Sequence, residues 1–185
     1  MELFEFLMIL LSIIVGLGLA EILMGIAGVL RDGRQRELCW VHSAVVLTVF
    51  IALLQVFWES WGLQEVEAWT FPAMMLMLAL PVLLFLIAHL LFPTEYPQAD
   101  LEEYYFERSR LIWSLALAGV IAGNAFRPLA FGEPLFAVDN ASSIVSFVSC
   151  TVLAATKLKP VHYALATLAP VTILLDTLAI SYVID

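Results

Sequence analysis

Seven polar or charged side chains lie inside long apolar stretches of this 185-residue chain, and these are the side chains that could do chemistry there. They are Glu21, Gln55, Glu59, His89, Asn124, Arg127 and Asp176. An ionised side chain at membrane depth costs at least about 2.5 to 3.5 kcal/mol, so such residues need partners or water. Histidine and desolvated carboxylates also titrate near neutral pH. We therefore expect these residues to line a pathway for a small solute or ion, with the proton as the coupling ion.

Depth along the expected helices divides the charged residues into two groups. At a rise of about 1.5 Å per residue, Glu21 and His89 fall in the cytoplasmic third of the membrane. A second group falls in the outer third: Gln55, Glu59, Arg127 and Asp176. We predict two charged pairs, Glu21 with His89, and Arg127 with Asp176 or Glu59. The alternative is that they are static salt bridges, which fix helix register.

Six apolar stretches must position these side chains. They cover residues 4–30, 40–58, 69–92, 111–131, 141–156 and 161–184. Each is near the roughly 20 residues that a helix needs to cross a bilayer. With 63% hydrophobic residues, the sequence predicts an all-α membrane protein, a bundle of six transmembrane helices. The short loops leave no room for a soluble catalytic domain, so we expect no enzyme and no catalytic residues.

Positive charges lie in alternate loops of this predicted bundle. Seven of the eight Lys and Arg residues are in three of the loops: Arg31, Arg34, Arg36, Arg108, Arg110, Lys157 and Lys159. Since cytoplasmic loops carry an excess of Lys and Arg, we predict these loops inside and both termini outside. Glu2 and Glu5 precede a long apolar run, which argues against a cleavable signal peptide. We expect an integral protein of the plasma membrane, of the bacterial inner-membrane type.

Paired prolines indicate a repeat of three helices. They are Pro72 and Pro81 in the third span, and Pro160 and Pro170 in the sixth. Because three is an odd number, halves formed by residues 1–92 and 111–185 would have opposite orientations. Inverted repeats of this kind recur in secondary transporters, with binding sites near the interface of the repeats.

Residues 93–110 join the two halves and gather acidic and tyrosine side chains. The cluster contains Glu95, Tyr96, Asp100, Glu102, Glu103, Tyr104, Tyr105 and Glu107. We interpret this segment as an acidic cytoplasmic loop with a solvated surface helix that leads into the fourth span. A docking site for a partner is the alternative interpretation.

Composition argues against several other classes. A net charge of −9 provides no basic surface for nucleic acid. Cys39 and Cys150 lack metal-ligand spacing and are expected to be unpaired apolar side chains. His42, His89 and His162 could ligate a haem, but two of them sit at span ends, where interfacial histidines are common. We expect no metal and no cofactor.

These observations together predict a small multi-pass transporter or channel for a small solute or ion. Two alternatives stay open. One is a non-transporting scaffold or subunit of a larger complex, and the other is a haem-binding redox protein. The expected partners are the lipid bilayer and the solute, and the small size suits a homo-oligomer.

Overall fold

The computed structural model describes residues 3–31, 39–66, 69–93, 100–132 and 141–180. Six α-helices make up most of them: α1 (Leu3–Arg31), α2 (Trp40–Glu59), α3 (Phe71–Leu90), α4 (Leu101–Phe131), α5 (Ala141–Ala155) and α6 (Lys159–Ile180). A short 3₁₀ helix, η1 (Ser60–Glu65), follows α2. The described residues contain no strand, which confirms the predicted all-α class. Arg34, Arg36, Glu95, Tyr96 and both chain ends lie outside the described residues.

Capping residues explain where two of the helices begin. The Asp100 side chain accepts a hydrogen bond of 2.8 Å from the backbone N–H of Glu102, so α4 begins at Leu101. Residues 101–110 of the expected loop are therefore the first turns of α4 and are continuous with the fourth span. Thr70 caps α3 through a bond of 3.3 Å from the N–H of Ala73, with Pro72 in the first turn.

Five of the six described helices are long and apolar enough to cross a membrane. These are the lengths and the composition of an integral, multi-pass membrane protein. The exception is α5, whose 15 residues extend only about 22 Å, against a hydrocarbon core of about 30 Å. Length and composition thus support five of the six predicted spans.

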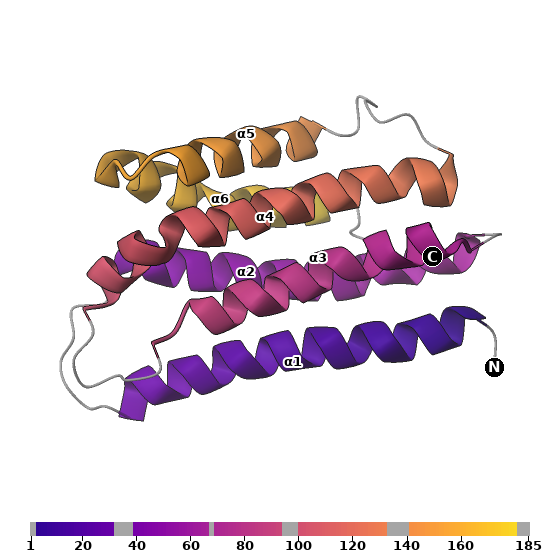
Figure 1. Cartoon of the computed structure of the whole chain (residues 1–185), viewed down its shortest axis with the longest axis horizontal. Coiled ribbons are helices and arrows are strands. Elements are labelled where there is room, and N and C mark those ends of the chain that lie inside the picture. The colour runs from indigo at the N-terminus through magenta and orange to yellow at the C-terminus, as the bar shows by residue number, and fades with distance from the viewer. Residues whose placement is uncertain (1–2, 32–38, 67–68, 94–99, 133–140, 181–185) are drawn as a thin grey trace.

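The helices lie in two layers (Figure 1). In one layer α1, α3, α4 and α5 lie side by side in that order, and in the other α2 packs against α6. The chain direction alternates, so that α2, α4 and α6 begin at the end of the bundle where α1, α3 and α5 finish. We call this end, at the left of Figure 1, the His162 end, and the opposite end the Trp69 end.

The two halves of the chain pack differently. In the first half α1 packs closely against α3, whereas in the second half α4 packs closely against α5 and α6 packs mainly against α2. An inverted repeat would place α6 against α4 in the way that α3 lies against α1. The arrangement of the described helices therefore does not show the predicted repeat.

The buried core has two parts. The larger cluster joins all six helices, and it holds buried side chains such as Leu53, Ile87, Trp113 and Leu153. A smaller cluster lies at the Trp69 end around Leu7, Leu63, Val66 and Met77. There the rings of Trp69 and Phe126 stack with centroids 6.3 Å apart, which ties the start of α3 to the last turns of α4. This stack fixes the height of α4 relative to α3.

Candidate functional site

Glu21 and His89 meet between α1 and α3. Nδ1 of His89 lies 3.3 Å from Oε2 of Glu21, so the contact predicted between them is present. His89 is one residue from the end of α3 and its side chain is 68% exposed, while that of Glu21 is 29% exposed. The pair therefore lies on the outer surface of the bundle near the His162 end.

Two amide side chains of the predicted pathway bond within their own helices. Nε2 of Gln55 donates to Oε1 of Glu59 on α2 across 2.7 Å. Nδ2 of Asn124 donates to the carbonyl oxygen of Val120 on α4 across 2.8 Å. Gln55 and Asn124 are half-buried, and Glu59 is exposed. Each amide side chain thus bonds to a residue of its own helix and remains partly exposed.

Contacts between α4 and α6 give the relative height of Arg127 and Asp176. Tyr105 bonds to His162 and Glu102 pairs with Lys159, and in both contacts the partners are 57 residues apart. The same offset places Asp176 level with Gly119, eight residues before Arg127. Eight residues of helix rise about 12 Å. Arg127 and Asp176 therefore do not lie at the same depth, which the predicted pair required.

The difference between the predicted and the described heights has its cause in the helix ends. The predicted depths were counted from span boundaries at residues 111 and 161, but α4 begins at Leu101 and α6 at Lys159. Arg127 follows Phe126, whose ring stacks on Trp69, so Arg127 lies at the Trp69 end of the bundle. The predicted contact of Arg127 with Glu59 stays a prediction.

Burial falls along the inward faces of four helices from the His162 end to the Trp69 end. On each helix, residues that share one face by the 3.6-residue period are buried near the His162 end. Farther along they become half-buried, and the polar residues are found there. The buried members include Val45 and Thr48 on α2, Tyr105 and Ile112 on α4, Cys150 and Leu153 on α5, and His162 and Ala166 on α6. The half-buried polar members include Gln55 on α2, Asn124 and Arg127 on α4, Ser143 and Ser146 on α5, and Asp176 on α6.

A buried hydrogen-bonded cluster closes the other end of these four faces, and the sequence did not predict it. Nε1 of Trp113 donates to the Tyr105 hydroxyl across 2.9 Å. That hydroxyl lies 2.7 Å from Nδ1 of His162, and Nε2 of His162 lies 2.8 Å from the carbonyl oxygen of Thr156. The exposed fractions are 5% for Trp113, 1% for Tyr105 and 0% for His162. We call these three side chains the aromatic cluster.

The helical period of the sequence could have indicated where two members of the aromatic cluster, Tyr105 and Trp113, lie. Tyr105, Ser109, Ile112 and Trp113 share one helical face, and that face continues into the polar stripe through Arg127. Because the span was predicted to begin at residue 111, the stripe was not extended back through the charged residues before it. His162 was taken for an interfacial histidine, whereas the structure buries it completely.

The two buried histidines, His42 and His162, have little capacity left for a metal or haem. Both ring nitrogens of His162 are already bonded. Nε2 of His42, which is also buried, lies 2.7 Å from the carbonyl oxygen of Leu91. Within the described ranges, no group of three His, Cys, Asp or Glu residues is placed to hold a metal ion. Ligation of haem iron by His162 would require one of its bonds to break.

Both cysteines are buried free thiols, as the sequence predicted. Cys39 directly precedes α2, and burial raises the pKa of its thiol. Cys150 lies on the inward face of α5, beside the core that contains Trp113.

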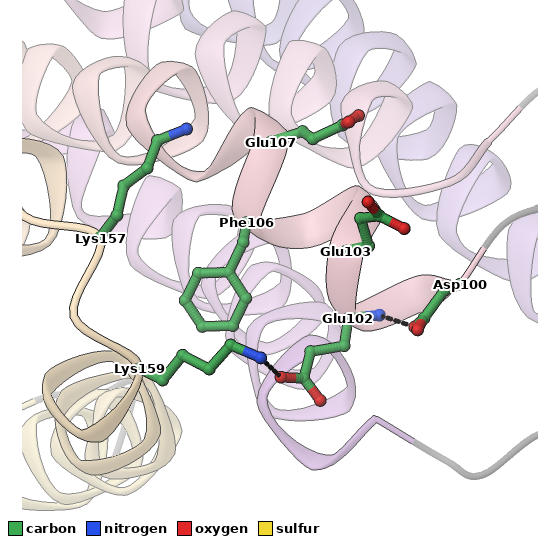
Figure 2. A pocket seen from close by; sticks show the side chains of 7 residues that line it. All are labelled: Asp100, Glu102, Glu103, Phe106, Glu107, Lys157 and Lys159. Atoms are coloured by element: carbon green, nitrogen blue, oxygen red, sulfur yellow. Dashed lines mark hydrogen bonds and ion pairs between the residues drawn. The ribbon is translucent and has the colours of Figure 1, made fainter.

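An open cleft of about 450 Å³ lies at the start of α4, next to the turn between α5 and α6 (Figure 2). It is lined by Asp100, Glu102, Glu103, Phe106, Glu107, Lys157 and Lys159. Nζ of Lys159 lies 2.6 Å from Oε1 of Glu102, and this ion pair joins α6 to α4 beside the aromatic cluster. The cleft carries more acidic than basic side chains.

Comparison with known proteins gives no relative from which a role could be transferred. No known protein family, curated protein or solved structure matches this chain. The inward faces of α2, α4, α5 and α6 differ between the two ends of the bundle. One end holds half-buried polar side chains and the other is closed by the aromatic cluster.

Proposed function

We propose that this protein is a small multi-pass transporter or channel for a small solute or ion, with its polar pathway between α2, α4, α5 and α6. The observation that carries the proposal is the fall in burial along the inward faces of these helices. A polar group at membrane depth is costly unless protein groups or water satisfy it. Because these side chains are only half-buried, water or a bound solute can reach them, and this is what a pathway requires.

The staggered depths of the polar residues support a pathway rather than a sealed ion pair. Asp176 lies deepest of the group, level with Gly119. Asn124 follows about 7 Å nearer to the Trp69 end, and Arg127 follows about 12 Å nearer. Sites at successive depths suit stepwise passage, since each has to bind weakly enough to release its occupant to the next.

Glu21 and His89 form a separate part of the proposal. They meet between α1 and α3, whereas the half-buried polar residues of the pathway are carried on α2, α4, α5 and α6. A carboxylate beside an imidazole brings together groups that can accept and donate a hydrogen bond to the same proton. This supports the proton as the coupling ion, bound beside the solute pathway rather than within it.

Thiol accessibility tests the pathway. In a chain that lacks both native cysteines, Gln55→Cys, Asn124→Cys and Asp176→Cys should react with a water-soluble, charged methanethiosulfonate reagent in lipid vesicles. The matched controls are Leu54→Cys, Leu129→Cys and Leu174→Cys, which replace exposed apolar side chains on the same helices. Lipid should protect these controls from the reagent. Equal protection of all six positions would contradict an aqueous pathway.

Flux measurements test the transport itself. Vesicles that contain the protein and a pH-sensitive dye report proton movement, and light scattering reports entry of glycerol or urea. We expect Asp176→Asn to reduce the flux, because the deepest polar site loses its charge. Leu174→Ala, on the neighbouring lipid-facing position, serves as the matched control.

A second candidate function is a non-transporting subunit of a larger complex, and the open charged cleft favours it. The residues that line the cleft lie at the surface of the His162 end, where a partner could reach them (Figure 2). Native gel electrophoresis of the membranes would then show the chain in a larger assembly. Glu103→Lys with Glu107→Lys should release it from that assembly, and vesicles should show no flux.

A further inference from the structure

The hydrogen bonds of the aromatic cluster determine the protonation state of His162. The carbonyl oxygen of Thr156 only accepts hydrogen bonds, so Nε2 of His162 must carry a hydrogen. In a neutral imidazole Nδ1 is then an acceptor, and the Tyr105 O–H donates to it. The Tyr105 oxygen in turn accepts from Nε1–H of Trp113. Every donor in this chain of bonds faces an acceptor, but only while His162 is neutral.

Protonation of His162 reverses the central bond of the cluster. An imidazolium carries a hydrogen on Nδ1 as well, so this N–H would face the O–H of Tyr105. The Tyr105 oxygen would have to accept from both neighbours, and its own hydrogen would need another acceptor inside a buried site. An unsatisfied buried donor costs about 1 to 3 kcal/mol.

The surroundings of His162 offer a buried cation little compensation. Tyr105 on α4 contacts His162 directly, and the titratable groups that act on Tyr105 or on Tyr163 beside it are Cys39 before α2, Glu102 on α4 and Lys159 on α6. Glu102 is the carboxylate in this set, and it is already bound to Lys159 at 2.6 Å. The edge of the Phe106 ring lies against His162, with centroids 5.2 Å apart. The site thus favours the uncharged form.

The aromatic cluster also carries much of the contact between two helices. α4 packs chiefly against α3 and α5, and α6 packs chiefly against α2. The Tyr105–His162 bond, the ring contact with Phe106 and the Lys159–Glu102 pair join α4 to α6 at the His162 end. The bond from His162 to Thr156 adds the turn that follows α5. Loss of the central bond would weaken this closure.

We propose that Trp113, Tyr105 and His162 form a proton-controlled latch, in which protonation of His162 separates α4 from α6 and opens the His162 end of the bundle. Water supplies the proton through this end, where α4 and α6 begin. The inference goes beyond the proposed transport function, because it concerns a conformational equilibrium that needs no solute.

Cys150 provides a native reporter for the latch. It lies on α5 in the core that contains Trp113, and it is 7% exposed. In a Cys39→Ala background, the rate at which Cys150 reacts with 4,4′-dithiodipyridine is measured from pH 8 to pH 5. At each pH this rate is divided by the rate for the detergent-unfolded chain, which gives a normalised rate. For the unsubstituted latch we expect the normalised rate to rise about tenfold as the pH falls, because the open population increases. With His162→Gln, which cannot be protonated, the rate should stay flat.

A matched control separates His162 from other buried histidines. His42 is buried at the same end and also bonds a backbone carbonyl, so His42→Gln should keep the rise. A flat rate without any latch substitution, or a rise that survives in His162→Gln, would overturn the proposal. A rise lost in His42→Gln as well would overturn the assignment to His162.

Tyr105→Phe keeps the test decisive if His162→Gln does not fold. This variant retains the histidine but removes the O–H group that opposes protonation. Labelling should already be faster at pH 8 than in the parent, and the further rise toward pH 5 should be smaller. An unchanged rate at pH 8 together with the full rise would count against the latch. No flux enters these measurements, so a failure of the transport proposal leaves the outcome readable.

Discussion

Nδ1 of His89 lies 3.3 Å from Oε2 of Glu21 across the contact between α1 and α3. The His89 side chain is 68% exposed and that of Glu21 is 29% exposed, so the pair is not sealed inside the bundle. Exposed ion pairs contribute about 0 to 1 kcal/mol. A double-mutant cycle with Glu21→Gln and His89→Gln should therefore give a coupling free energy of unfolding below about 1 kcal/mol in detergent. A coupling of about 3 kcal/mol or more, as for a buried pair, would contradict the exposed position.

Two glycines of α1 provide a matched test of packing. A Cβ atom on Gly25 would overlap the ring of Phe92, whereas one on Gly16 would meet no heavy atom within 4 Å. We expect Gly25→Ala to lower the free energy of unfolding by about 1 to 3 kcal/mol, as overpacking does. Gly16→Ala should be neutral or stabilise the protein by up to about 1 kcal/mol, through helix propensity. Thermal unfolding in one detergent compares the two, and an equal effect at both positions would contradict the described contact of α1 with Phe92, which follows α3.

The buried thiol of Cys39 should react slowly with iodoacetamide. The thiolate is the reactive form, and a pKa raised by burial lowers the thiolate fraction at pH 8. Folded protein should therefore label more slowly than detergent-unfolded protein, and the rate should continue to rise above pH 9. Cys150→Ala isolates Cys39 for the measurement. Labelling as fast as in the unfolded chain would show that Cys39 is not buried.

Arg127 and Asp176 should behave as independent sites. Their helical positions differ by about 12 Å along the bundle, and distant sites give additive effects within about 0.3 to 0.5 kcal/mol. We expect the unfolding free energies of Arg127→Leu and Asp176→Leu to add in the double variant. Denaturant titration of the four proteins measures this. A coupling above about 1.5 kcal/mol would restore the predicted ion pair.

The sequence contained enough information for the helices and for one of the two predicted charged pairs. Apolar stretches of about 20 residues give helices wherever the backbone leaves water, so their number and approximate bounds follow from composition. The Glu21–His89 contact was predictable because both depths were counted from the outer ends of the first and third spans, which run in the same direction. Buried free cysteines followed from their apolar neighbours.

The aromatic cluster and the height of α6 were not predictable in the same way. Tyr105 and His162 are 57 residues apart, and nothing local to either residue specifies their bond. Asp100 caps α4, which begins ten residues before the expected span, so the charged first turns belong to the same helix as the membrane part. The height of one helix against another is set by side-chain packing, which the period of a sequence does not encode.

The short fifth helix has a consequence for the surrounding lipid. Its 15 residues reach about 8 Å less than a hydrocarbon core of about 30 Å requires. As the fifth predicted span, α5 would require the lipid acyl chains beside it to shorten, and such hydrophobic mismatch costs a fraction of a kcal/mol for each ångström. The edge formed by α5 would therefore gather shorter or more disordered lipids than the edge formed by α1, whose 29 residues exceed the bilayer core. The protein would accordingly favour thin bilayers, with one side of the bundle determining that preference.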